Sequence, residues 1–261
     1  MRRVSPKVFL IGETRVIDEG LDAYLKHVGA PEWTTDAPSD AEKLTEVCGR
    51  LCYKSFKPGL NQNVTRVREG NDKYVGNLVE VGHGSVLEHA VVNFVFADVS
   101  RVFTHELVRH RVGTAISQES LRYVRLTDLG LWLPTVIASD SAASQMFQEI
   151  FEYLEKIQLK LAEMFNLDGD KVPFHFKKLV TSAMRRIAPI GLATSIAWSA
   201  NHRTIRHVLE MRTAPEAEEE IRLVFGKVGE LMLARYPNIY GDFTVEVVEG
   251  LSCYRPKHSK I

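Results

Sequence analysis

Two stretches of the chain concentrate side chains that bind anions. Residues 101–125 and 177–212 are rich in arginine and lysine, although the whole chain balances 33 basic against 33 acidic side chains. A guanidinium group presents a planar set of N–H donors that grips a phosphate with paired, charge-assisted hydrogen bonds. Two local arginine-rich stretches in a neutral protein favour anionic small molecules as ligands over a nucleic-acid duplex.

The segment from His105 to His110 has the residue types of a zinc-protease helix at the wrong spacing. The H-E-x-x-H helix of those enzymes places its two histidines four residues apart on one face. Here the histidines are five residues apart, so on a helix their side chains diverge by roughly 140°. Arg109 stands where the second histidine is needed, and it does not ligate a cation. The sequence therefore predicts no metal site.

Other familiar catalytic signatures are missing from the sequence. Gly82-His83-Gly84 lacks the third glycine of a dinucleotide-binding fingerprint, and no phosphate-binding P-loop pattern occurs. Cys48 and Cys52 are four residues apart, which is the spacing of core positions on a helix and differs from the C-x-x-C of redox and zinc sites. We expect both cysteines to be structural.

The segment RHRVGTAISQESLRY, residues 109–123, resembles the signature of flavin-dependent thymidylate synthases. That signature is Arg-His-Arg, a gap of seven or eight residues, and a serine followed by x-Arg-Tyr; here the gap is eight and the serine is Ser120. Three more segments are similar to the family in the same order: GHGSVLEH at 82–89, Arg185 with Pro189, and Asn201-His202-Arg203 through Arg212. The likeness covers about residues 80–240 and is loose before residue 60.

The resemblance implies a site for FAD and a site for dUMP. The residues implied at the FAD site are Ser85, Arg109, His110, Arg111, Gln118, Asn201, Arg203 and His207. The residues implied at the dUMP site are Glu106, Arg109, Gln118, Glu119, Ser120, Arg122, Arg185 and Arg212. Glu106 stands where some members have Gln, and His207 replaces an Asn. The role of His110 stays open between stacking, hydrogen bonding and general-base catalysis.

The resemblance also implies the reaction. The enzyme methylates dUMP to dTMP, with 5,10-methylenetetrahydrofolate as carbon donor and NADPH as the reductant of FAD. Arg212 is the implied catalytic residue, which polarises or ionises the uracil by electrostatic stabilisation. The other class of thymidylate synthase uses a cysteine in a Pro-Cys-His context, and none of the three cysteines here has that context. The family's homotetramer, with active sites between subunits, is implied as well.

Periodicity and capping signals predict a helix-rich α+β fold. Strands are expected at residues 7–11, 91–96 and 244–248, and helices at 39–53, 64–81, 100–111, 139–165, 173–186 and 201–212. Another helix is expected to start at Thr213-Ala214-Pro215, because proline suits a first helical turn. The family resemblance implies a mostly antiparallel, twisted sheet flanked by helices.

These elements predict how the arginines are presented. Arg109 and Arg111 are expected at a helix end, where residues two apart point about 200° away from each other. Gly113 then turns the backbone into a loop that wraps a flat ring. On the later helix, Asn201, Val208 and Arg212 are expected near one face, and Arg203 and His207 on another.

Length and composition allow a single domain. The chain has 261 residues, 45% of them hydrophobic and 25% charged, which is ordinary for a globular protein. We expect one flavin-dependent thymidylate synthase domain over residues 1–261. No apolar run approaches the roughly 20 residues that cross a bilayer, and residues 1–10 do not form a convincing signal peptide. A cytoplasmic protein that binds neither membrane nor nucleic acid is expected.

Two other classes of function remain as alternatives. One is a metal-dependent hydrolase built from His83, Glu88, His89, His105 and His110. The other is an RNA- or nucleotide-binding module that uses the arginine clusters without catalysis. The zero net charge and the lack of an interleaved aromatic platform disfavour the second.

Overall fold

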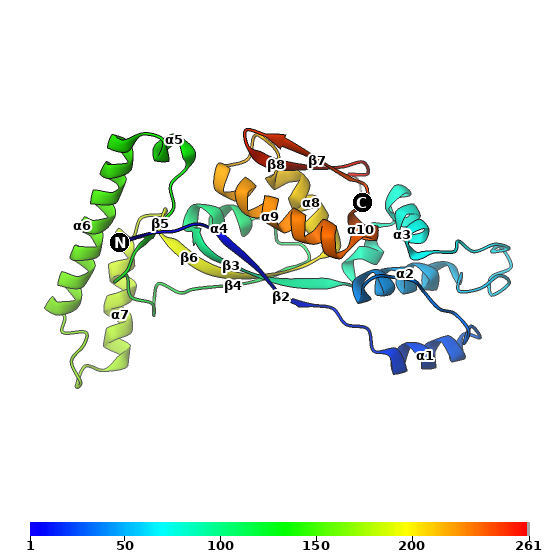
Figure 1. Cartoon of the computed structure of the whole chain (residues 1–261). Coiled ribbons are helices and arrows are strands. Elements are labelled where there is room, and N and C mark those ends of the chain that lie inside the picture. The colour runs from blue at the N-terminus through cyan, green and yellow to red at the C-terminus, as the bar shows by residue number, and fades with distance from the viewer. Residues whose placement is uncertain (260–261) are drawn as a thin grey trace. The chain divides into compact units, whose positions relative to one another are not determined.

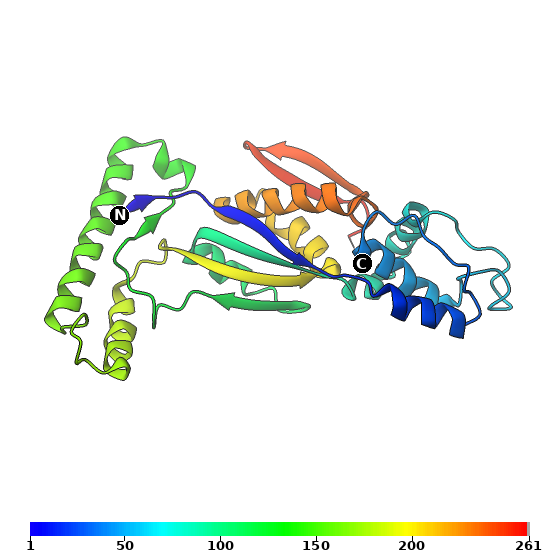
Figure 2. The ribbon, with the colours of Figure 1, turned by 60° about the horizontal axis from the view of Figure 1, so that its bottom comes forward.

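A computed structural model describes residues 1–259, and it confirms the α+β class with a mostly antiparallel sheet (Figure 1). The described residues form a four-stranded sheet in the order β2-β3-β6-β4 and two sheets of two strands. The four strands are β2 (Lys7–Glu13), β3 (Val91–Ser100), β6 (Ala193–Asn201) and β4 (Thr114–Gln118). Figure 2 shows them running side by side. In the small sheets, β1 (Arg2–Arg3) pairs in parallel with β5 (Gly130–Leu131), and β7 (Phe243–Val248) pairs antiparallel with β8 (Leu251–Pro256).

Helices fill most of the remaining chain. In order they are α1 (Asp18–His27), α2 (Asp40–Tyr53), α3 (Asn71–Glu80), the 3₁₀ turn η1 (Gly84–Glu88), α4 (Arg101–Leu107), α5 (Thr135–Ala138), α6 (Ser141–Met164), α7 (Phe174–Met184), the 3₁₀ turn η2 (Arg185–Ile187), α8 (His202–Arg212), α9 (Glu219–Arg235) and α10 (Pro237–Tyr240). None of them, within residues 1–259, is long and apolar enough to cross a membrane.

The chain divides into two compact units. Unit 1 consists of Met1–Phe9, Val95–Arg109 and Ile116–Trp198. Unit 2 consists of Leu10–Phe94, His110–Ala115 and Ser199–Ile261. Each strand of the four-stranded sheet has residues in both units. The expectation of a single domain over residues 1–261 stays a prediction.

Unit 1 is built on aromatic packing and on two paired helices. Phe96 and Trp198 lie on the buried face of the sheet, and Phe103 meets Phe96 edge to face at 5.4 Å. Side chains of α6 and α7 share a small core formed by Ala162, Leu167, Val180 and Met184. The two helices lie side by side in both ribbon views.

Unit 2 packs α8, α9 and the β7–β8 hairpin together. Gly229 of α9 lies against the ring of Tyr254, where a Cβ at position 229 would come within 2.4 Å of that ring. The buried His202 contacts Tyr236 and Tyr240 with ring centroids 4.6 and 5.7 Å away. A close-packed interior of this kind fixes the face that α8 presents to solvent.

Three predicted helix starts are confirmed by side-chain caps. Ser39, Ser100 and Asn201 each accept a hydrogen bond from a backbone N–H of the first turn, at Glu42, Phe103 and Thr204. Such caps replace the hydrogen bonds that the first turn of a helix lacks.

Two predicted helix starts are wrong. Helix α3 begins at Asn71 and not near residue 64, because Gly70 adopts a φ of +86° and the carboxylate of Asp36 accepts the N–H of Asn71. Helix α9 begins at Glu219 and not at residue 213. Thr213 is instead buried, and its hydroxyl donates to the carbonyl of Leu209 and accepts the N–H of Tyr254.

The sheet is larger than predicted. Strand β3 continues to Ser100, and β4, β6, β8 and helix α1 have no counterpart in the predicted elements. The sequence of β6, ATSIAWSAN, is dominated by small residues, so its strand character comes from pairing with its neighbours in the sheet. The residues after Gly113, expected as a loop, form β4.

Candidate functional site

Three of the predicted site residues meet where α8 lies beside residues 110–113 in unit 2, and a fourth, Asn201, begins that helix. Arg212, in the last turn of α8, donates its Nε–H to Nε2 of His110 over 2.8 Å. His207, five residues earlier on α8, faces the His110 ring edge to face at 6.1 Å. Asn201 caps the start of the same helix. Helix α8 therefore gathers His110, His207 and Arg212 at one place.

The hydrogen bond identifies the protonation state of His110. Nε2 can accept only when it carries no proton, so the ring is neutral and its proton is on Nδ1. Burial, the adjacent Arg212 and His207 lower the pKa of His110 from 6.5 to about 4. At neutral pH the site thus contains an uncharged imidazole beside a guanidinium cation.

Backbone hydrogen bonds hold residues 110–113 against the start of α8. Asn201 donates its N–H to the carbonyl of Gly113 over 3.1 Å, and the hydroxyl of Thr204 donates to the carbonyl of Val112 over 2.8 Å. Gly113 has a φ of +69°, and a Cβ there would lie 2.3 Å from Nδ2 of Asn201. This close approach requires a glycine.

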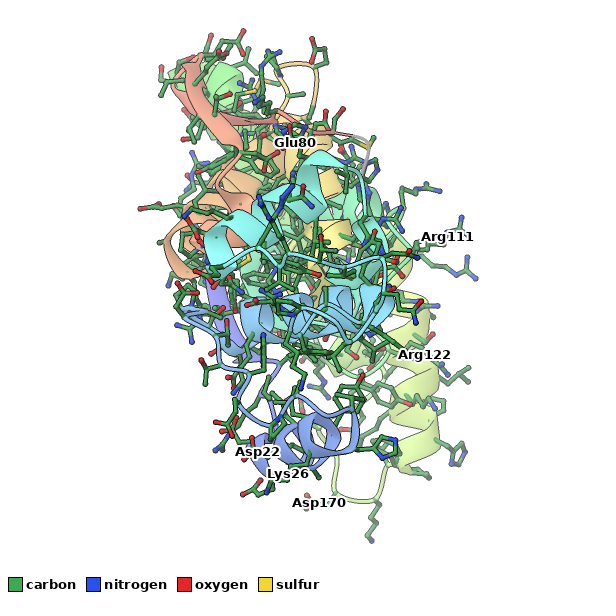
Figure 3. All side chains as sticks on the ribbon, turned by 90° about the vertical axis from the view of Figure 1, so that its right-hand side faces the viewer. Asp22, Lys26, Glu80, Arg111, Arg122 and Asp170 are labelled. Atoms are coloured by element: carbon green, nitrogen blue, oxygen red, sulfur yellow. The ribbon has the colours of Figure 1, made fainter. Side chains whose placement is uncertain are left out.

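Ser85 and Arg203 are connected through Glu88. Arg203, on the exposed face of α8, forms an ion pair with Glu88 of η1, the turn that also carries the exposed Ser85. His207 is exposed as well, which agrees with the predicted face shared by Arg203 and His207. Arg111 extends into solvent (Figure 3). Ser85, Arg111, Arg203 and His207 are thus exposed polar residues of unit 2.

The remaining predicted residues belong to unit 1. The carboxylate of Glu119 accepts the N–H of Ser195 over 2.9 Å and the hydroxyl of Thr194 over 3.2 Å, so it is held against β6. Nε2 of Gln118 donates to the hydroxyl of Thr104 on α4 over 3.1 Å. These bonds fix the end of β4 against its neighbours.

Ser120 and the exposed Arg122 lie in the turn that follows β4. The hydroxyl of Ser120 accepts the N–H of Arg122 over 3.3 Å. Arg185 is exposed at the start of η2. Both arginines therefore present their guanidinium groups to solvent on unit 1.

Helix α4 is shorter than expected at Arg109 and Arg111. It ends at Leu107, two residues before Arg109, and the two arginines belong to different units. Arg109 is exposed, and its Nε donates to the carbonyl of His105 over 3.2 Å. Glu106 lies half-buried on α4. Within residues 1–259, no group of three or more His, Cys, Asp or Glu side chains could hold a metal ion.

Arg101 is a candidate that lies outside the sequence motifs. It starts α4, its Nη2 donates to the carbonyl of Glu119 over 3.2 Å, and its buried Nε has no hydrogen-bond partner in residues 1–259. Burial and then the positive charge of Arg185 lower its pKa, and the carboxylate of Glu119 raises it. A partly buried guanidinium with an unsatisfied N–H favours an anionic partner. In the sequence, Arg101 is marked only by its position directly after Ser100, the predicted capping residue of a helix.

Comparison with known proteins gives the family of this chain. The sequence model of the thymidylate synthase complementing protein family matches residues 35–238, which begins well before the motifs near residue 80. Flavin-dependent thymidylate synthases from Corynebacterium glutamicum and Mycobacterium marinum are each 32% identical to this chain. The matches cover 83% and 90% of this chain, and 85% and 93% of those proteins.

A solved structure has the same fold. The crystal structure of thymidylate synthase X from Helicobacter pylori with FAD and dUMP superimposes with a TM-score of 0.59 over 91% of this chain and 98% of the other, at 16% identity. The family match over more than half of the chain, together with these relatives, confirms the resemblance that begins at the Arg-His-Arg segment. The chain belongs to the thymidylate synthase complementing protein family.

Proposed function

We propose that this chain is a flavin-dependent thymidylate synthase that methylates dUMP to dTMP. The observation that supports it most directly is the family match across residues 35–238, which includes every residue implied at the two sites. The Helicobacter pylori protein of the same fold was solved with FAD and dUMP.

The residues of unit 2 fit the chemistry of FAD. A flavin dinucleotide carries a pyrophosphate and a ring with several hydrogen-bonding atoms, and these residues offer two guanidinium groups, two imidazoles and a carboxamide around a backbone approach that only glycine permits. The family resemblance assigns FAD binding to Ser85, His110, Arg111, Asn201, Arg203 and His207 of unit 2, and to Arg109 and Gln118, which belong to unit 1. When bound, the flavin supplies hydride chemistry, and the protein supplies orientation and charge.

The residues of unit 1 fit a nucleoside monophosphate. The family resemblance assigns dUMP binding to Glu106, Arg109, Gln118, Glu119, Ser120, Arg122, Arg185 and Arg212. Arg185, with the neighbouring Arg101, supplies cationic donors for a phosphate. Glu119 is held by β6, so it orients the backbone of the Ser120 turn.

Arg212 is the proposed catalytic residue. Its guanidinium stabilises negative charge that develops on the uracil, which replaces activation by a cysteine nucleophile. NADPH and 5,10-methylenetetrahydrofolate are the proposed co-substrates. A homotetramer with shared active sites and a cytoplasmic location complete the proposal.

The first experiment is the absorbance spectrum of the purified protein. We expect a flavin band that bleaches when NADPH is added without oxygen, and formation of dTMP from dUMP and methylenetetrahydrofolate. Colourless protein that does not take up FAD and retains stoichiometric zinc would support a metal-dependent hydrolase instead.

Replacement of Arg212 tests the catalytic assignment. Arg212→Ala is expected to reduce dTMP formation at least about a hundredfold, because removal of one preorganised donor costs roughly 10²–10³ in rate, while FAD uptake is largely retained. The flavin content and the turnover number are measured together. Normal turnover would refute the role of Arg212.

Replacement of the cysteines tests the absence of a thiol nucleophile. Cys48, Cys52 and Cys253 are free thiols, and Cys253 is buried. Their joint replacement by Ala is expected to leave measurable dTMP formation. Complete loss of activity in a folded protein that still binds FAD would indicate a cysteine nucleophile.

A further inference from the structure

The His110–Arg212 hydrogen bond has a direction that determines what each group can do. Arg212 donates through Nε, the atom that joins the guanidinium plane to the side-chain stem. A hydrogen bond at Nε restricts rotation of that plane about the Cδ–Nε bond. A group that accepts at Nε therefore sets the direction in which the whole guanidinium presents its charge.

The acceptor is itself held in place. The carbonyl of His110 accepts the hydroxyl of Thr114 over 3.0 Å, and the next residues are hydrogen-bonded to Asn201 and Thr204 at the start of α8. Both groups are therefore held to α8. Arg212 is part of the last turn of that helix, and the backbone just after His110 is hydrogen-bonded to its start.

The surroundings of His110 keep its accepting nitrogen unprotonated. The charged and titratable groups that face the ring are Arg212 and His207, both on α8. Together with partial burial they lower the pKa of His110 to about 4. A proton on Nε2 would place two cations 2.8 Å apart and remove the acceptor, so the hydrogen bond requires the neutral ring.

We propose that His110 is a positioning residue that orients the Arg212 guanidinium by accepting its Nε–H, and that protonation of His110 disengages Arg212. This inference rests on the proposed catalytic function of Arg212. His110 thus acts through Arg212.

The contact is tested first without FAD, substrate or turnover. Nitrogen-15 NMR of the histidine rings is expected to find His110 in the Nδ1–H tautomer at pH 7.5. Its titration is expected to move upward by at least about one pH unit in Arg212→Gln, because a neighbouring cation is removed. A ring in the Nε2–H tautomer, or the same titration in both proteins, would overturn the proposal.

The functional coupling is tested by a double-mutant cycle in the FAD-loaded enzyme. His110→Ala is expected to lower kcat by about tenfold, the equivalent of one hydrogen bond, with a smaller change in the KM for dUMP. The same replacement in Arg212→Ala is expected to change kcat less than twofold. Equal effects in both backgrounds would mean that His110 does not act through Arg212.

Matched variants separate positioning from loss of structure or flavin. His110→Gln retains an acceptor oxygen and is expected to recover most of kcat, and its rate is expected to lose the acid dependence that His110 imposes. His27→Gln, at an exposed histidine of α1, is the control for a neutral histidine replacement. Flavin content is measured for each variant. Wild type that forms no dTMP while the NMR coupling is present would refute the proposed function and leave the His110–Arg212 contact standing.

Discussion

Buried polar side chains in this protein make its stability depend on pH. His202 is fully buried, its Nδ1 lies 2.9 Å from the hydroxyl of Tyr240, and its Nε2 has no hydrogen-bond partner in residues 1–259. Desolvation lowers the pKa of His202 to about 3. The folded protein therefore contains a neutral histidine that becomes charged when the chain unfolds at acid pH.

The sign of this dependence follows from the lowered pKa. Between pH 6.5 and about 3, His202 is protonated in the unfolded chain and neutral in the folded protein. The free energy of unfolding therefore falls as the pH falls. We expect His202 to cost about 2 kcal/mol of stability at pH 5 relative to pH 7.5. Urea unfolding of wild type and His202→Phe at both pH values measures it. Equal pH dependence in the two proteins would contradict the assignment.

Arg101 gives a prediction about substrate affinity. If its guanidinium and that of Arg185 share the dUMP phosphate, Arg101→Ala raises the KM for dUMP by at least about tenfold and changes kcat less, because a phosphate contact serves the ground state and the transition state alike. Arg255→Ala, at an exposed arginine of β8, is the control. An unchanged KM for dUMP would remove Arg101 from the site.

Among the structural elements, the turn at Gly113, just before β4, is in contact with the residues that begin α8. Its positive φ and its contact with Asn201 and Thr204 leave no room for a side chain. A Cβ there would move the capping residue of α8, and with it the helix that carries His207 and Arg212.

Gly113→Ala tests this connection. We expect a loss of about 1–3 kcal/mol in the free energy of unfolding and a reduced affinity for FAD, because the left-handed backbone and the contact with Asn201 are both strained. Gly76→Ala, at a glycine of α3 with open space around its Cα, is the control and is expected to be neutral or stabilising. Chemical unfolding and flavin titration measure the two effects. Undiminished FAD affinity in Gly113→Ala would separate the turn from the flavin site.

At the scale of the whole molecule, helix α6 has an apolar face that unit 1 does not cover. Met146, Ile150 and Tyr153 recur at helical spacing and are 64%, 54% and 63% exposed. Large apolar side chains that recur along one exposed face are typical of contact surfaces between proteins. The proposed homotetramer offers a second copy of the chain as the partner.

Ile150→Glu is expected to reduce the assembly to a smaller species, because a carboxylate would be buried without a partner in the contact. Gln148→Glu adds the same charge at an exposed position of α6 and is the control. Light scattering after gel filtration gives the mass of each. A variant with the mass of wild type would exclude this face of α6 from the interface.

Features that depend on neighbouring residues could be predicted from the amino-acid sequence. Ser39, Ser100 and Asn201 cap helices because their side chains reach the adjacent backbone, and the amphipathic period located α2, α6, α7 and α8. The order and spacing of the Arg-His-Arg and Asn-x-Arg segments were sufficient to indicate the family.

Features that depend on distant residues became visible in the folded chain. The strand β6 consists largely of small residues and exists because β3 and β4 pair with it. Helix α4 ends before Arg109, and α9 starts after Thr213 because the Thr213 hydroxyl accepts the N–H of Tyr254. The contact between His110 and Arg212 joins residues 102 positions apart, and no local pattern encodes it. Periodicity and capping report interactions within a few turns of the chain, whereas pairing and side-chain contact are set by how the folded segments meet.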